Sequence, residues 1–200
     1  MNQPSHIPLS TERLIVRSLE PGDAAALCSY RSLPEVARYQ SWESFGTDDA
    51  ARLIDEQRER EFGVPGTWFQ LAIIETATSI MIGDCGLHCL RGDPSQIEFG
   101  ITLAPSAQGR GYATEALGSL LDLVFGTLGK HRVSAVTDAD NDAAASLFRR
   151  LGFRQEALFV EHRWYKGHWD SEFVFAMLRR EWEFHSAKGK CDPHSKEAAR

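Results

Sequence analysis

The stretch PSAQGRGYATEA, residues 105–116, joins the apolar run IEFGITLA to the amphipathic segment ATEALGSLLDLVF. Gly109 and Gly111 flank Arg110 immediately before the expected helix. The first N–H groups of a helix have no intrahelical acceptor, and the helix dipole adds positive potential at the same end. Glycine lets an anion approach the backbone where a Cβ atom would collide. The junction therefore predicts a cradle for an anionic group such as a phosphate. A plain strand-to-helix turn is the alternative.

Two familiar phosphate-binding loops match this stretch poorly. A Walker loop requires GxxxxGK[ST], and no lysine follows the glycines here. A dinucleotide-binding fingerprint requires GxGxxG directly after a strand, but Thr114 stands at the third glycine position and the glycines come four residues after Pro105. Asp138, at the end of the next expected strand, keeps a nucleotide-dependent oxidoreductase open as a distant alternative.

The composition is typical of a globular domain. Of the 200 residues, 42% are hydrophobic and 25% are charged, and the formal net charge is −6, which disfavours a protein that coats nucleic acid. The longest aliphatic runs, such as LAII at 71–74, are far shorter than a membrane span, and the N-terminal residues show no secretory signal. We therefore expect a cytoplasmic protein that binds neither nucleic acid nor membrane.

The cysteines and histidines do not predict a metal site. No CxxC motif, no zinc-finger spacing and no HExxH pair occurs in the chain. We expect no bound metal, and we expect reduced thiols at Cys28, Cys85, Cys89 and Cys191.

Hydrophobic periodicity predicts a mixed α/β domain over 12–184, between a short extension over 1–11 and a disordered tail over 185–200. Strands are expected at 13–19, 68–75, 79–90, 95–104, 131–138, 154–165 and 170–178. Helices are expected at 21–39 with a break near Pro34, at 48–60 with Thr47 as N-cap, at 113–126, and at 142–151 with Asn141 or Asp142 as N-cap. This order implies a mixed sheet with helices on its faces.

Two motifs carry a family resemblance. QGRGYA at 108–113 resembles the Q/R-x-x-G-x-G/A loop of the GNAT superfamily of acetyl-CoA-dependent N-acetyltransferases, and Asn141 followed by LGF at 151–153 resembles the second signature of that superfamily. The likeness runs from TERLIVR to FVFAMLRREW, and WYKGHWDSEFVFAML is similar to the ribosomal-protein-alanine (RimJ/RimL-like) branch. The resemblance implies the GNAT fold, a predominantly antiparallel mixed sheet of about seven strands flanked by about four helices, with central strands splayed to admit CoA.

The resemblance also implies where acetyl-CoA binds. The loop N–H groups would hold its pyrophosphate, the strand over 96–104 would pair with its pantetheine arm, and Asn141 would hold that arm from the far side. The cofactor-binding residues expected on this basis are Ile101, Thr102, Leu103, Gln108, Gly109, Arg110, Gly111, Tyr112, Ala113, Thr114, Asn141, Ala144 and Phe148.

Acyl transfer to an amine requires a base for the amine, a donor for the thioester oxygen and a proton for the leaving thiolate. Glu98 is the expected base, because it lies on the strand that should flank the acetyl group. An ordinary ion-paired strand carboxylate is the competing interpretation. The reserve candidates for the base are Asp84, His88, Glu161 and His162.

The thiolate acid is missing at its usual places. The RimJ/RimL-like branch often has Ser three residues after the signature Asn, and other branches have Tyr seven residues after it. This chain has Ala144 and Phe148 there, and neither can donate a proton. Ser146 falls on a different face of the expected helix. A non-catalytic acyl-CoA-binding module is therefore a second possible function.

Acceptor specificity is expected in the segment 21–61 and the hairpin 155–170. The expected acceptor contacts are Trp42, Glu98, His162 and Trp164, with Tyr39, Phe45 and Trp169 as further aromatic candidates. Core packing is the alternative for each aromatic residue. We expect an N-acetyltransferase that moves the acetyl group of acetyl-CoA to a primary amine, on a protein N-terminus or a small molecule, by direct attack in a ternary complex. We expect it to act as a monomer or a homodimer.

Overall fold

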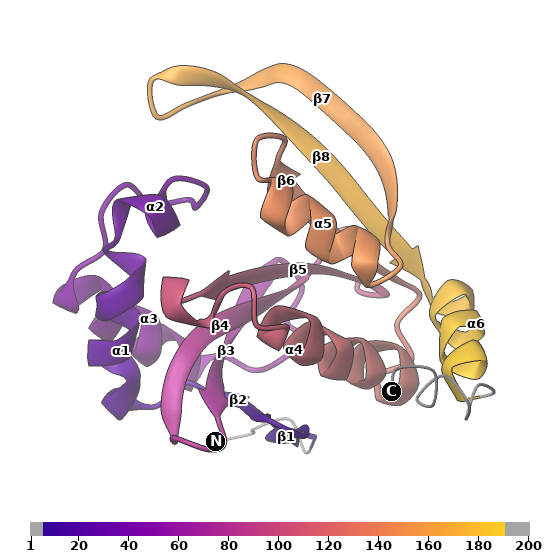
Figure 1. The fold of residues 1–200 in the computed structure, drawn as a ribbon, viewed down its shortest axis with the longest axis horizontal. Helices are drawn as coiled ribbons and strands as arrows, with labels where there is room; N and C mark the ends of the chain where they lie inside the picture. The colour runs from indigo at the N-terminus through magenta and orange to yellow at the C-terminus, as the bar shows by residue number, and fades with distance from the viewer. Residues whose placement is uncertain (1–5, 191–200) are drawn as a thin grey trace, which may run out of the picture.

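The computed structural model describes residues 6–190, and an eight-stranded sheet runs through the molecule (Figure 1). The strand order is β1-β2-β3-β4-β5-β6-β8-β7, and every neighbouring pair is antiparallel except β5–β6. The strands are β1 Leu9–Ser10, β2 Leu14–Ser18, β3 Thr67–Glu75, β4 Ile80–Cys89, β5 Gln96–Leu103, β6 Arg132–Asp138, β7 Arg154–Tyr165 and β8 His168–Leu178. The expected mixed, mainly antiparallel sheet is confirmed. Its extra strand is β1, which pairs with Ile15 and Val16 of β2.

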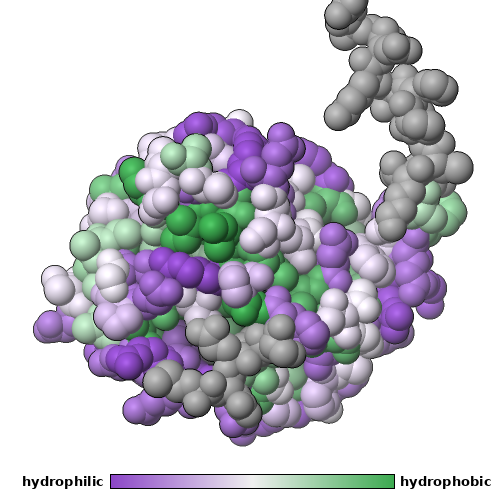
Figure 2. All heavy atoms as spheres, turned by 90° about the horizontal axis from the view of Figure 1, so that it is seen from below, coloured by the Kyte–Doolittle hydropathy of each residue, from purple (hydrophilic) through white to green (hydrophobic). Residues whose placement is uncertain are grey.

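Helices pack on both faces of the sheet (Figure 1). The bounds are α1 Ala24–Arg31, α2 Pro34–Ala37, α3 Thr47–Glu59, α4 Tyr112–Leu121, α5 Asp142–Arg150 and α6 Arg179–Lys190. Successive strand residues point to opposite faces, so Ala72 of β3 packs in one apolar cluster with residues of α1 and α3 while Leu71 packs in the other with residues of α4 and α5. We call these sides the α1–α3 face and the α4–α5 face. Figure 2 shows the molecule from below this view, where charged and polar residues surround smaller apolar areas.

Three helix boundaries differ from the expectation. Gly46, not Thr47, is the N-cap of α3, because the Asp49 carboxylate accepts a hydrogen bond from the Gly46 N–H at 2.9 Å. The helix over 21–39 divides into a short 3₁₀ turn, α1 and α2, since Pro34 forces Leu33 into an extended conformation. Helix α6 was not expected, and it continues through residues 185–190 of the expected tail. Residues 191–200, with Cys191, lie outside the described part of the chain.

The two central strands separate along their length. The parallel ladder joins Gln96, Ile97 and Glu98 of β5 to Arg132, Val133 and Ser134 of β6 and ends there. The Ser95 carbonyl accepts from N–H groups at the start of β6. Since strand residues alternate in direction, Phe99, Ile101 and Leu103 turn their main-chain groups toward the resulting gap. The splay that the resemblance implies is therefore present.

Ion pairs hold the base of the β7–β8 hairpin against β6 and α6. The Glu156 carboxylate accepts hydrogen bonds from Arg132 and Arg154, and Arg154 also contacts Glu181 of α6. The hydrogen bond from Arg132, joined by that from Arg154, lowers the pKa of Glu156 to about 2. This carboxylate is therefore charged in the folded protein well below the pH at which a free glutamate takes up a proton.

Glu156→Gln is expected to weaken the dependence of stability on acid. The folded pKa of about 2 lies below the ordinary value of 4.5, so the unfolded chain takes up the proton first. The stabilisation from Glu156 is fully present above the unfolded pKa and is lost as the pH falls through the folded one. Melting temperatures between about pH 2 and pH 5 measure the effect. If melting temperature depends on pH equally steeply in Glu156→Gln and in the native chain, the prediction is wrong. Glu161→Gln, at an exposed position of β7, is the control.

Candidate active site

The loop between β5 and α4 presents open backbone donors. Gly109 and Gly111 have φ values of +73° and +82°, and Gly111 is the N-cap of α4. No side chain among residues 6–190 caps this end of α4, so the N–H groups of its first turn remain for an external acceptor. A Cβ atom at Gly109 would meet no atom within 4 Å, so the space above the loop is open. This geometry suits the expected anion cradle.

Arginines from three elements gather at the loop. Arg110 is 57% exposed at its side chain and lies 3.6 Å from Glu75. Arg13, directly before β2, donates to the Arg110 carbonyl at 3.0 Å and pairs with Glu115. Arg150 of α5 donates to the Thr114 hydroxyl at 3.4 Å. Arg13 and Arg150 are functional candidates that the sequence analysis missed, because only the packing of β2 and α5 against α4 brings them here.

Tyr112 anchors the loop from inside the protein. Its side chain is 3% exposed, and its hydroxyl donates to the Glu75 carboxylate. This hydrogen bond raises the pKa of Tyr112 and lowers the pKa of Glu75. The backbone N–H of Tyr112, and not its ring, therefore faces the space where a phosphate would lie.

The strand residues expected to contact the cofactor divide into two kinds. Ile101 and Leu103 turn their main-chain groups toward the gap, although the Leu103 carbonyl already accepts from the Gln108 amide at 3.1 Å. Thr102 is buried, and its main chain turns toward β4, where Asp84 is its partner. The pairing with a pantetheine arm is therefore available to alternate residues of β5.

Asn141 is confirmed as the N-cap of α5. Its Oδ1 accepts from the Ala144 N–H at 3.1 Å, which leaves the amide NH₂ group for a second partner. Ala144 is half-buried, whereas Phe148 is 3% exposed and packs against the rings of Phe153 and Phe175. The structure thus places Phe148 in the core.

No hydroxyl stands at the two usual positions for the thiolate acid, and the nearby Ser146 is exposed to solvent. The phenol of Tyr39 reaches the same end of β6 from the opposite face, where its hydroxyl lies 3.3 Å from the Asp140 carbonyl. Tyr39 is therefore beside the signature Asn141 in space, although it is distant in sequence.

Glu98 lies where β5 and β6 part. It is the last β5 residue in the ladder, and its carboxylate stands on the α1–α3 face. Its Oε2 is 3.4 Å from Nδ1 of His88, and the two side chains are 26% and 22% exposed. Trp68 stacks on His88 with ring centroids 5.0 Å apart. The structure therefore brings the expected base together with one of the reserve candidates.

The other reserve candidates lie away from Glu98 or are bound to other groups. Asp84 is fully buried and binds Arg31, Tyr30 and Gln70. His162 pairs with Glu172 at 3.1 Å on the hairpin, and Glu161 is an exposed residue of β7.

The expected acceptor aromatics belong to separate clusters. Trp42 donates to the Arg31 carbonyl, and its ring lies 4.4 Å from the Arg31 guanidinium. Phe45 covers the same guanidinium at 5.1 Å. Trp164 and Trp169 contact each other near the tip of the hairpin and are 60% and 55% exposed. The contacts among the described residues place Glu98 in neither cluster.

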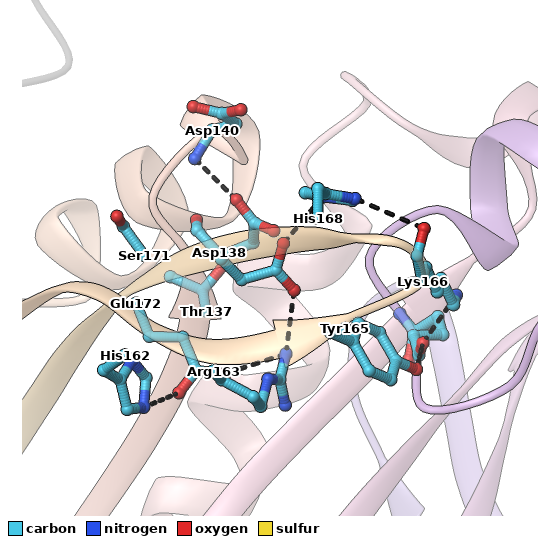
Figure 3. Close-up of polar contacts among 12 residues, drawn as sticks. Thr137, Asp138, Asp140, His162, Arg163, Tyr165, Lys166, His168, Ser171 and Glu172 are labelled. Atoms are coloured by element: carbon cyan, nitrogen blue, oxygen red, sulfur yellow. Dashed lines mark hydrogen bonds and ion pairs between the residues drawn. The ribbon is translucent and has the colours of Figure 1, made fainter.

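The hairpin tip is bound to the last residue of α2 and to the segment after it (Figure 3). The turn at Lys166 and Gly167 has positive φ at both residues, as the sequence predicts for a hairpin. The Lys166 ammonium donates to the carbonyls of Ala37, Gln40 and Trp42, and the Tyr165 hydroxyl also donates to Gln40. Burial lowers the pKa of Lys166. The hairpin therefore forms a fixed arch on the α1–α3 side of the gap.

Residues 13–154 match the family described as Acetyltransferase (GNAT) domain. The chain belongs to this family. It is an N-acetyltransferase that uses acetyl-CoA, and neither the non-catalytic module nor the oxidoreductase is favoured. Within residues 6–190 we find no helix with the length and apolar character needed to cross a bilayer, and no group of three or more His, Cys, Asp and Glu side chains that could hold a metal ion.

Relatives of known name support this assignment. The uncharacterized N-acetyltransferase p20 of Bacillus licheniformis is 32% identical over 87% of this chain and 97% of its own length. The [Ribosomal protein uS5]-alanine N-acetyltransferase of Escherichia coli is 25% identical over 89% of this chain and 95% of its own, which supports the likeness to the RimJ/RimL-like branch. The spermidine N-acetyltransferase of Vibrio cholerae, solved in complex with CoA and spermine, shares the fold with a TM-score of 0.75 and 21% identity over 86% of this chain and 99% of its own.

Proposed function

We propose that this enzyme transfers the acetyl group directly to a primary amine in a ternary complex, with Glu98 as the base. The observation that carries the proposal is the position of Glu98 at the point where β5 and β6 part, with the open loop after Leu103 at the other end of the same gap. The strand from Glu98 to Leu103 rises about 17 Å, which suits an extended arm between a phosphate cradle and a reacting carbonyl.

Residues of the loop and of the gap hold the donor. The N–H groups of Gly109, Gly111 and the first turn of α4 bind the pyrophosphate, and the exposed Arg110 and Arg150 add positive charge. Ile101 and the free amide of Asn141 hold the arm from its two sides. An N–H group of β5 that faces the gap, at Phe99 or Ile101, donates to the thioester oxygen as negative charge develops on it.

Glu98 receives one proton of the acceptor ammonium, directly or through one water. The amine lone pair then attacks the thioester carbonyl carbon, so a C–N bond forms while the carbonyl oxygen becomes an oxyanion. When the carbonyl reforms, the C–S bond breaks. The second proton on nitrogen passes to the sulfur, and CoA leaves as the thiol. This route needs no hydroxyl at Ala144 or Phe148.

The proposal also covers the cellular location, the oligomeric state and nucleic-acid binding. We place the enzyme in the cytoplasm as a monomer or homodimer that binds no nucleic acid, in keeping with a formal net charge of −6. Light scattering after size-exclusion chromatography measures the oligomeric state. Mobility of a labelled duplex and of a labelled single strand tests for nucleic-acid binding.

A panel of amines tests the proposed function. We expect thiol release from acetyl-CoA that depends on the amine, together with a product that mass spectrometry shows to carry one acetyl group. The panel should contain aliphatic diamines, amino sugars and peptides with a free α-amine. Binding of acetyl-CoA without thiol release on any amine would instead support an acyl-CoA-binding module.

Gly109→Asp is expected to weaken acetyl-CoA binding at least about tenfold relative to Gly109→Asn. Both side chains tolerate the left-handed φ of +73° at this position, and they differ mainly in charge. The aspartate places a negative charge beside the phosphate, whereas the asparagine does not. Isothermal titration calorimetry of the two variants measures the difference. Equal affinities would show that the loop does not hold an anion.

A further inference from the structure

We propose that Trp68, His88 and Glu98 form the acceptor subsite, and that it takes a linear aliphatic amine with more than one cationic group. The inference rests on the proposed function, because Glu98 is the base in both. It adds two residues and a chemical class of acceptor.

The three side chains form a row across three strands. Trp68 of β3 is directly paired with His88 of β4, and His88 is directly paired with Glu98 of β5. Directly paired residues share a face of the sheet, so the whole row lies on the α1–α3 face. The Trp68 and His88 rings are nearly parallel, with 15° between their planes. The row ends at the edge of the gap, where the acetyl group is expected.

Two glycines make room for the tryptophan. Gly86 of β4 and Gly100 of β5 are also paired, one and two strands away from Trp68. A Cβ atom at Gly86 would stand 2.7 Å from Cε3 of Trp68, and one at Gly100 would stand 3.4 Å from Cζ3. The ring therefore lies over Gly86 and reaches Gly100 of β5, in space that any larger residue would fill. The surface of the sheet beside Glu98 is thus lined by glycine and an aromatic edge.

The chemistry of this row favours a cation. Trp68 is 37% exposed, although its ring is large and apolar. An aromatic face beside a carboxylate attracts an ammonium through both the ring quadrupole and the negative charge, and it also packs against methylene groups. A linear diamine can place one amine at Glu98 and its chain along Trp68. A peptide N-terminus carries a bulky, polar backbone at the same distance from its amine.

His88 acts as a positioning residue. Its Nδ1 lies 3.4 Å from the Glu98 carboxylate, and its ring is held against Trp68. This contact holds the Glu98 carboxylate in one rotamer, directed at the gap. Because Asn can offer an amide nitrogen near the place of Nδ1, His88→Asn should keep most of the kcat that His88→Ala loses.

Trp68→Leu tests the subsite. With putrescine as the acceptor we expect KM to rise about tenfold while the Kd of acetyl-CoA stays within about twofold. Trp68→Phe should retain most of the affinity, and it covers the case in which Trp68→Leu fails to fold. Phe184→Leu, at an aromatic residue that is 58% exposed on α6, is the control.

The outcomes separate the subsite from the proposed function. Unchanged KM in Trp68→Leu, or an alanine-initiated peptide as the preferred acceptor with a KM insensitive to that change, would overturn the subsite. If the native enzyme releases no thiol on any amine, the proposed function fails. Calorimetry of putrescine on the CoA-saturated native protein and Trp68→Leu then still decides the subsite: weaker binding in the variant supports it, and equal or absent binding overturns it.

Discussion

Glu98→Gln is expected to lower kcat by about 10²–10⁴-fold near neutral pH, with little change in the affinity for acetyl-CoA. The amide keeps the shape of the side chain and can still hydrogen-bond to His88, but it cannot take a proton from the acceptor. The lost rate therefore reports proton transfer and not a change of packing. Steady-state kinetics with the best amine of the panel measures it.

Two further measurements make this result specific. The rate of Glu98→Gln should recover as the pH rises and more of the acceptor is already deprotonated. Glu183→Gln, at an exposed position of α6, should leave kcat unchanged. If Glu98→Gln has the same pH–rate profile as the native enzyme, Glu98 is not the base, and a water relay would have to take the proton.

Asp84→Ala is expected to destabilise the fold by about 3–5 kcal/mol. Asp84 is fully buried, and its carboxylate accepts hydrogen bonds from Arg31, Tyr30 and Gln70. The Arg31 side chain is only 7% exposed, so removal of the carboxylate leaves a buried cation without its counter-charge. Urea unfolding followed by circular dichroism measures the loss.

A double change checks the cause. If the uncompensated guanidinium is the main cost, Arg31→Met combined with Asp84→Ala should be more stable than Asp84→Ala alone. A loss below about 1 kcal/mol in the single variant would mean that water or another group compensates Arg31.

Local patterns predict much of this fold. Period-two alternation places most strands, and the Lys166-Gly167 turn predicts the final hairpin. The two motifs at 108–113 and 141–153 imply, through the resemblance, the loop and the splay. Helix boundaries are less predictable where the N-cap depends on three-dimensional geometry. At the start of α3, the Asp49 carboxylate accepts from the Gly46 N–H, so Gly46 and not Thr47 is the N-cap.

The acceptor side was harder to predict, because it depends on register between strands. Trp68, His88 and Glu98 are separated by ten or more residues in sequence, and only the alignment of β3, β4 and β5 places them in one row. The aromatic residues chosen from the sequence, Trp42 and Trp164, contact Arg31 and Trp169, and their role toward the acceptor stays a prediction. No local pattern distinguishes an aromatic residue beside a gap from one that fills a cluster.

The parting of β5 and β6 also has a thermodynamic consequence. Three residue pairs are all that join these two strands, so the sheet consists of two halves linked at one end. In the proposed complex, the arm of acetyl-CoA lies in this gap and pairs with main-chain groups of β5, so binding of the donor is expected to stabilise the sheet. In each cycle, CoA must give up its pairing with β5 before it can leave the gap. The free protein is therefore expected to melt at a lower temperature than its complex with acetyl-CoA.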